Sequence, residues 1–388
     1  MGRIGIGRIF SGSIHQDEQI VICNGDDISR PTKVTKLYEF LGTGRVEVEE
    51  GKFGDIVAIA GLQDDALTIG STICLPETPD PLAYVEIDEP TLSVFYGVNT
   101  SPFAGREGTK LTSRQIRDRL YKETRINLAL RVEDTDNGDT FKVSGRGQLH
   151  LAILMEQMRR EGFEMQVSAP DVIYKEIDGT RCEPFELLTV DIDEQYQGTI
   201  MEILGQRKAI LKSIEHHGDQ NSKVRMEFVI PARGLIGFRS KFVTETRGTG
   251  MMGHRFAGYE PHVGPLPTRN KGSLISMEQG ETRGFSLESL QSRGTLFIEP
   301  GTEVYNGMII GEHTRDNDLD VNPTKGKKLT NTRASGSDDA IKLAPPRPIT
   351  LESALDWIKS DELMEITPES IRLRKRFLLI HERKRSKD

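Results

Sequence analysis

Basic side chains gather near the C-terminal end of the sequence, and the chemistry they offer is phosphate binding. The stretch NPTKGKKLTNTRASGSDDAIKLAPPRP, residues 322–348, has little with which to build a core. Its basic residues ahead of the first acid are Lys325, Lys327, Lys328 and Arg333. Phosphate contacts need mobile cations and few other groups. We therefore predict that residues 322–337 form a phosphate-binding loop, mobile when free because little apolar burial offsets the entropy of ordering it.

The last nineteen residues, SIRLRKRFLLIHERKRSKD, hold eight Lys/Arg against two acids and offer the same chemistry. We expect a helix to start at Thr367 and Pro368. The basic residues placed on that last helix are Arg372, Arg374, Lys375 and Arg376. Simpler explanations remain open at this point: a solvated helix surface or frayed tail here, and a disordered surface insertion at 322–337.

The motif-like stretches in the sequence lack the structural context or the partner residues that catalysis needs. GTGMMG at 248–253 fits the dinucleotide pattern GxGxxG, but the residues before it look helical and those after it extended, the reverse of what a pyrophosphate site needs. The pair His216 and His217 lies on an extended segment, where neighbours point to opposite faces. The sequence holds no GxxxxGK[ST], HExxH or GxSxG. We predict no catalytic residue, no metal site and no cofactor in this chain.

Composition sets the broad class. The 388 residues are enough for three or four domains, and the net charge is −8. No apolar run approaches the ~20 residues of a membrane span, and three scattered cysteines favour a cytoplasmic protein without membrane contact. The first eighty residues are acidic, which contrasts with the basic C-terminal end and suggests a polyanionic partner there. The acids crowded there are Glu47, Glu49, Glu50, Asp55, Asp64 and Asp65.

The N-terminal part of the sequence reads as short strands separated by glycine turns. Residues 1–83 show no helical period, and we predict a β-barrel there. From 84 to 178 the order is βαββαβ, with Thr112 and Gln115 as a capping box, INLALRV (126–132) as a strand, and a second helix ending before Gly162.

The βαββαβ order then repeats over 179–263, where a strand, a helix, two strands, a helical span and a final strand follow one another. Two ferredoxin-like modules are the economical interpretation. Residues 264–388 read as a mixed α/β region, with Thr350 capping a helix that carries Leu351 and Leu355. The predicted fold class is multidomain α+β.

These stretches resemble a known family. A β-barrel followed by two ferredoxin-like modules is similar to domains II, III and V of the translational GTPases. GRGQLHLAILMEQMRREGFE (145–164) resembles their domain III helix, and PARGLIGFRSKFVTETRGTGMMGHRFAGYEP (231–261) their domain V signature. The region from 322 onward resembles the C-terminal domain particular to the BipA (TypA) ribosome-associated GTPases. The family's GTP-binding domain has no counterpart in these residues, so no catalytic assignment carries over, and GTP and Mg²⁺ belong to that domain.

The resemblance implies a cytoplasmic, monomeric factor that binds the ribosome. It implies contacts of the C-terminal domain with ribosomal RNA and with the acceptor end of A-site tRNA, made by the loop at 322–337. It also implies roles in stress and cold adaptation and in large-subunit assembly.

Two other functions stay open on the residues alone. One is an RNA-modifying enzyme, which would need a cleft with perturbed carboxylates or histidines near the basic loop. The other is a scaffold whose acidic barrel recruits a basic ribosomal protein, with Glu47, Glu49 and Glu50 as contacts.

Overall fold

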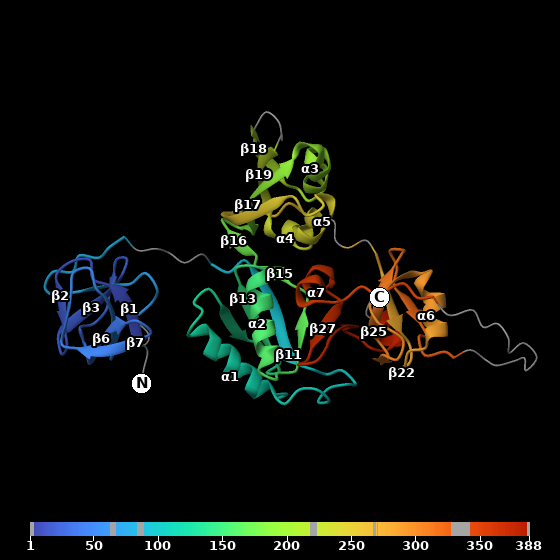
Figure 1. The fold of residues 1–388 in the computed structure, drawn as a ribbon, viewed down its shortest axis with the longest axis horizontal. Coiled ribbons are helices and arrows are strands. Elements are labelled where there is room, and N and C mark those ends of the chain that lie inside the picture. Colours follow the sequence, from blue (N-terminus) through green and yellow to red (C-terminus); the bar gives the residue numbers. More distant parts are fainter. Residues whose placement is uncertain are drawn as a thin grey trace, which may run out of the picture. The chain divides into compact units, whose positions relative to one another are not determined.

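The structure is a computed structural model that describes residues 4–62, 67–83, 89–217, 223–266, 269, 271–326 and 342–385. The chain divides into two compact units, Met1–Asp88 and Glu89–Asp388 (Figure 1). No helix in the described ranges is long and apolar enough to cross a membrane.

The described part of the first unit is built from strands, as predicted for a β-barrel. One sheet has the order β1-β9-β6-β7, a second has β10-β3-β4 with β5 on β3, and β2 pairs with β8. The continuous apolar runs of β3 and β9 bury successive residues such as Ile20, Ile22 and Ile59 in one core. The strands are β1 (Ile4–Arg8), β2 (Ser13–His15), β3 (Gln19–Asn24), β4 (Asp27–Ile28), β5 (Thr32–Lys33), β6 (Lys36–Leu41), β7 (Gly44–Val48), β8 (Glu50–Lys52), β9 (Ile56–Ala60) and β10 (Thr72–Cys74).

The second unit begins with the predicted βαββαβ module, whose strands lie in the order β12-β13-β11-β14. The capping box of Thr112 and Gln115 is present, and the helix that follows buries Ile116 and Leu120. The next helix gives way to Gly162, which has a φ of 88°. The elements are β11 (Leu92–Val98), α1 (Ser113–Thr124), β12 (Arg131–Asp134), β13 (Thr140–Gly145), α2 (Gln148–Arg160), β14 (Met165–Ser168) and β15 (Asp171–Val172), which pairs with β11.

The strand predicted over 126–132 is wrong for its first five residues, 126–130. The amides of Ile126 and Asn127 donate to the carbonyl of Glu123, which continues the end of α1 as turns. Pairing with β13 starts at Arg131, so the apolar alternation before it belongs to a turn segment.

The second module repeats this topology, with strand order β18-β19-β17-β20. Its predicted helical span is two short helices, separated at Gly237 by a φ of 68°. GTGMMG runs from the turn after a helix into a strand, in the predicted order. The elements are β16 (Lys175–Ile177), β17 (Thr180–Asp193), the 3-10 helix Glu194–Tyr196, α3 (Gln197–Gln206), β18 (Ile210–His217), β19 (Lys223–Pro231), α4 (Ala232–Leu235), α5 (Phe238–Glu245) and β20 (Met251–Pro261).

The last region shares a sheet with the first module. β14 pairs with β27, with Met165 opposite Ile366, and the sheet runs on through β28, β25, β21 and β26. Thr350 caps α7 as predicted, and α7 packs on α2 in a common core (Figure 1). The elements are β21 (Ser273–Ser276), β22 (Gly280–Glu281), α6 (Gly284–Gln291), β23 (Gly294–Leu296), β24 (Glu303–Val304), β25 (Met308–His313), β26 (Leu319–Val321), α7 (Leu351–Trp357), β27 (Glu362–Ile366), β28 (Ile371–Lys375) and α8 (Ile380–Arg385).

The helix predicted to start at Thr367 is also wrong, because these residues make a hairpin turn. The amide of Thr367 donates to the carbonyl of Ser370 at 3.0 Å, and the amide of Ser370 donates to the Thr367 hydroxyl at 2.8 Å. β27 precedes this turn and β28 follows it, and the final helix begins only at Ile380.

Candidate nucleic-acid interface

The predicted phosphate-binding loop leaves and rejoins the fold on one helix, α6. At the start, the Ser286 hydroxyl donates to the carbonyl of Asn322 at 2.5 Å. At the return, the side chain of Gln291 donates to the carbonyl of Lys342 at 3.0 Å and accepts from the amide of Ala344 at 3.1 Å. Both ends of the basic segment are therefore fixed to the same short helix.

Lys325 lies just after the first anchor and is exposed. The Asn322 side chain accepts from the amide of Thr324 at 3.0 Å, which forms a turn immediately before it. The other predicted phosphate contacts, Lys327, Lys328 and Arg333, lie outside the described residues, as does the expected mobility of the loop.

The basic residues predicted for a C-terminal helix lie instead on strand β28 or directly after it. Arg374 and Lys375 are 2% and 1% exposed, and the Arg372 side chain is 14% exposed, whereas Arg376 is exposed. A buried charge is costly unless it is paired and hydrogen-bonded, so each of the first three needs partners inside the fold.

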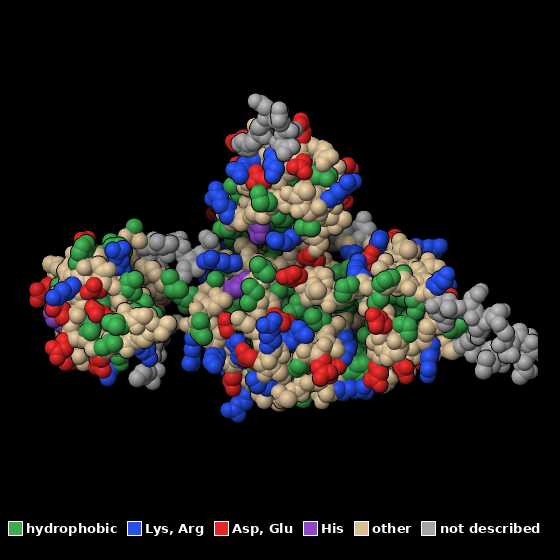
Figure 2. Space-filling model, in the orientation of Figure 1, with side chains coloured by type: hydrophobic (Ala, Val, Ile, Leu, Met, Phe, Trp, Pro, Cys, Tyr) green, Lys and Arg blue, Asp and Glu red, His purple; other side chains and the backbone are tan. Residues whose placement is uncertain are grey.

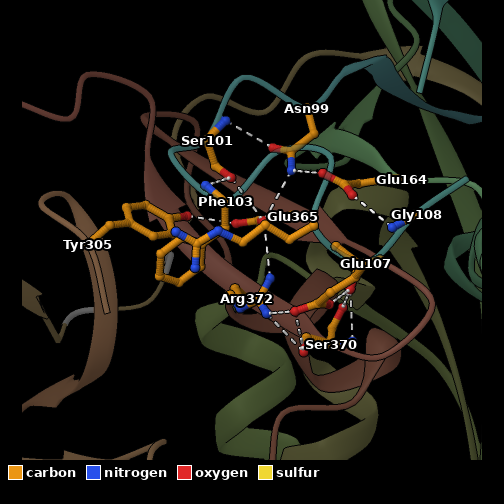
Figure 3. Close-up of polar contacts among 12 residues, drawn as sticks. Asn99, Ser101, Phe103, Glu107, Gly108, Glu164, Tyr305, Glu365, Ser370 and Arg372 are labelled. Atoms are coloured by element: carbon orange, nitrogen blue, oxygen red, sulfur yellow. Dashed lines mark hydrogen bonds and ion pairs between the residues drawn. The ribbon is translucent and has the colours of Figure 1, made fainter. Parts of the chain in front are cut away.

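Arg372 finds those partners in two acids (Figure 3). Its guanidinium contacts Glu107 and lies 3.1 Å from a carboxylate oxygen of Glu365. Glu365 is fully buried and also accepts from the hydroxyls of Tyr305, at 2.7 Å, and Ser101, at 2.9 Å. This cluster joins the loop after β11 to the β27–β28 hairpin.

Burial and pairing act in opposite directions on the pKa of Glu107 and in the same direction on the pKa of Tyr305. Burial alone would raise the pKa of Glu107, but hydrogen bonds from Thr367 and Arg372, with the charge of Arg372, bring it below its usual range. Burial, followed by the neighbouring charge of Glu365, raises the pKa of Tyr305 well above its usual value. Tyr305 therefore stays a neutral donor.

Lys375 is also paired with acids, whereas one guanidinium nitrogen of Arg374 donates to neutral side chains. The Lys375 ammonium lies 2.7 Å from Asp318, 2.8 Å from Asp361 and 2.9 Å from Glu362. The Arg374 guanidinium donates to the Thr100 hydroxyl at 2.8 Å and to the side chain of Gln166. Three of the four candidates on this segment thus hold the fold together.

Glu107, Glu362 and Glu365 are the functional partners that sequence reasoning missed. A signal for Glu362 and Glu365 was present, although none pointed to Glu107: Ile371 and Leu373 alternate with basic residues at the period of a strand. A strand in that position needs a neighbour, and ELMEI supplies acids at a matching spacing.

A site for RNA modification would need perturbed groups in a cleft. Burial raises the pKa of Asp356, although hydrogen bonds from Ser240 and Gly237 act against it. These contacts tie α7 to α5, which is a structural role. Among the described residues no cluster of His, Cys, Asp or Glu could hold a metal ion.

The acids proposed for a scaffold, Glu47, Glu49 and Glu50, are exposed residues of the first unit. Acidic side chains are visible on the drawn face of that unit (Figure 2). Glu47 pairs with Lys36 at 3.0 Å, and Glu50 with Lys52 at 3.5 Å and with His15 at 3.6 Å. The two lysines moderate the negative charge that the sequence shows there.

Three family models cover most of the chain. Residues 2–74 match elongation factor Tu domain 2, residues 180–269 match the elongation factor G C-terminus, and residues 271–379 match the TypA/BipA C-terminal domain. Together with the barrel and the ferredoxin-like modules, these matches define a chain built from domains of the translational GTPases.

Relatives identify the family within that class. Across this chain's full length, the identity is 51% to the "Large ribosomal subunit assembly factor BipA" of Escherichia coli K12 and 46% to the protein of that name from Bacillus subtilis. This chain belongs to the TypA/BipA family. It spans 63% of the length of each of these relatives. A solved structure from Thermus thermophilus aligns at 14% identity with a TM-score of 0.40, covering 68% of this chain and 54% of its own.

Proposed function

We propose that this chain is the ribosome-binding part of a translational GTPase and that its basic segment at 322–337 contacts RNA. The anchoring of both ends of this segment on α6 carries the proposal, since it fixes the points between which the basic residues lie in the sequence and leaves Lys325 exposed. The relatives named as large-subunit assembly factors support the ribosome as partner.

Within this proposal the contacts are Lys325, Lys327, Lys328, Arg333 and Arg376. Arg372, Arg374 and Lys375 position the hairpin, because ion pairs hold Arg372 and Lys375 inside the fold and a hydrogen bond to Thr100 holds Arg374 there. The RNA partners are ribosomal RNA and the acceptor end of A-site tRNA, and the setting is cytoplasmic large-subunit assembly and adaptation to stress and cold. The chain acts as a monomer, and GTP and Mg²⁺ bind in a domain that these residues do not include.

The test is co-sedimentation with purified ribosomes across a salt series. The chain is compared with a variant in which Lys325, Lys327, Lys328 and Arg333 are alanine. Each lost phosphate contact makes the log-log salt slope shallower by roughly 0.7–0.9, so the variant should lose about 3 units of slope.

A matched control removes the same charge from exposed positions elsewhere in the second unit. Its residues are Arg114, Lys122, Arg160 and Lys212, all changed to alanine. Equal slopes for the two variants would contradict the loop assignment, and binding insensitive to salt would contradict the RNA interface as a whole.

A further inference from the structure

A hollow of about 410 Å³ opens beside the end of β28. Its wall comes from separate parts of the second unit: the loop at 100–102, Gln279, Asn306 and the stretch 374–382. Because one wall is pinned to the other through Arg374 and Thr100, the hollow is held open by internal contacts.

Two polar atoms of the lining residues are buried without a partner among the described residues. They are Nε of Arg374, which is a donor, and Oδ1 of Asn306, which is an acceptor. A buried polar group left unpaired is costly, so these two atoms favour a ligand that brings an acceptor and a donor together. The edge of a nucleobase carries such a combination.

Apolar surface stands next to these polar groups. Phe377 is 44% exposed and Leu379 is 40% exposed, and both line the hollow with Pro102. An exposed aromatic ring beside polar groups is the arrangement on which single-stranded nucleic acids stack their bases.

The charges of the lining restrict the ligand further. The lining carries Arg374 and Arg376 against Glu382, an excess of one positive charge. Glu382 also accepts from the amide of Leu379 at 3.3 Å, which fixes it at the start of α8. One excess positive charge suits a single phosphodiester better than a multiply charged phosphate group.

We propose that this hollow binds one unstacked nucleotide of an RNA strand. The base stacks on Phe377, its edge meets Asn306 and Arg374, and its phosphate lies near Arg376. This inference rests on the proposed RNA-binding function and adds to it a second contact, separate in sequence from the segment at 322–337.

The direct test uses the full chain and short single-stranded RNAs with one photoreactive 4-thiouridine at the centre. Cross-links mapped by mass spectrometry should fall on Gln279, Asn306 or 377–379. Phe377→Ala should abolish them, whereas Phe95→Ala should not, because Phe95 is also 44% exposed but lies on β11 away from the lining. Cross-links mapping elsewhere, or equally strong in Phe377→Ala, would overturn the proposal.

Ribosome binding by the same two variants separates this inference from the proposed function. Base stacking on an aromatic side chain predicts an affinity loss between about 5-fold and 150-fold for Phe377→Ala and none for Phe95→Ala. If ribosomes bind both variants equally, the nucleotide site is overturned while the proposed function stands. If no variant binds ribosomes but the cross-links map to the hollow, the nucleotide site stands and the proposed function fails.

Discussion

The basic segment that starts at Lys325 and the basic strand β28 carry the same residue types and have opposite surroundings. Lys325 is exposed, whereas Arg374 and Lys375 are among the most buried charged residues described. Their difference teaches that a run of positive charge does not by itself identify a partner outside the molecule. The secondary structure that carries the charges decides whether they are exposed or bound by other groups of the same chain.

Strand pairing explains the inward orientation of β28. In the antiparallel register with β27, Lys375 lies opposite Glu362 and Arg372 lies opposite Glu365. Opposite charges at paired positions stabilise a sheet. The segment from Lys325 has no acid until Asp338, so it brings no such local partner.

The largest effect is expected for Arg372→Met. Removing this guanidinium leaves Glu107 and Glu365 with unbalanced buried charge, and breaking such a cluster costs about 3–5 kcal/mol. Trp357 is the single tryptophan and lies in the core of the second unit, so its fluorescence reports urea unfolding there.

The matched control is Arg376→Met, at an exposed position on the same segment, which should change stability by less than about 0.5 kcal/mol. A similar loss of stability in both variants would contradict the distinction between the partly buried Arg372 and the exposed Arg376.

A smaller loss is expected for Tyr305→Phe. This change removes the hydroxyl that donates to Glu365 at 2.7 Å and leaves the ring packed edge-on against Phe103. A buried acceptor deprived of one donor costs about 1–3 kcal/mol. The same fluorescence measurement checks this value, and an unchanged midpoint would show that Ser101 and Arg372 satisfy Glu365 without Tyr305.

Acidification should have a smaller effect again. The folded pKa of Glu107 lies below its usual value because hydrogen bonds from Thr367 and Arg372 outweigh burial. The contribution of Glu107 to the free energy of unfolding is therefore complete above the unfolded pKa of about 4.3. This contribution is lost as pH falls through the lower folded pKa. The urea midpoint of the second unit should fall below about pH 4.3, and less steeply in Arg372→Met. Parallel pH profiles would contradict this role for the pair.

The smallest effect concerns ribosome binding by Arg376→Ala. Loss of one phosphate contact should make the salt slope shallower by roughly 0.7–0.9 without changing the urea midpoint. Arg114 is also exposed and serves as the control. An equal change of salt slope in Arg114→Ala would show that the slope depends on the overall charge of the chain and not on a specific contact of Arg376.

Local signals predicted much of this fold. The capping box at Thr112, the turn glycine Gly162 and the periodicity of both βαββαβ modules each depend on residues close in sequence. The pairing of β14 with β27 joins residues about two hundred positions apart, and no local pattern encodes it. The helix expected after Thr367 failed for the same reason, since pairing with distant strands overrode a local start signal.

The candidate site was predicted less well than the fold. Positive charge is visible in a sequence, but the acids that neutralise it lie as far away as Glu107, which contacts Arg372. The hollow beside β28 has walls from four separate segments, so its existence depends on the assembled fold.

The β14–β27 ladder has a consequence for synthesis of the protein. A chain emerging from its own ribosome completes β14 roughly two hundred residues before the strand that covers its edge has been made. Until then the first module carries an unpaired strand edge, which is a template for association with other chains. Premature termination before Glu362 would therefore yield an aggregation-prone product, and chaperone capture during translation should be strongest in that interval.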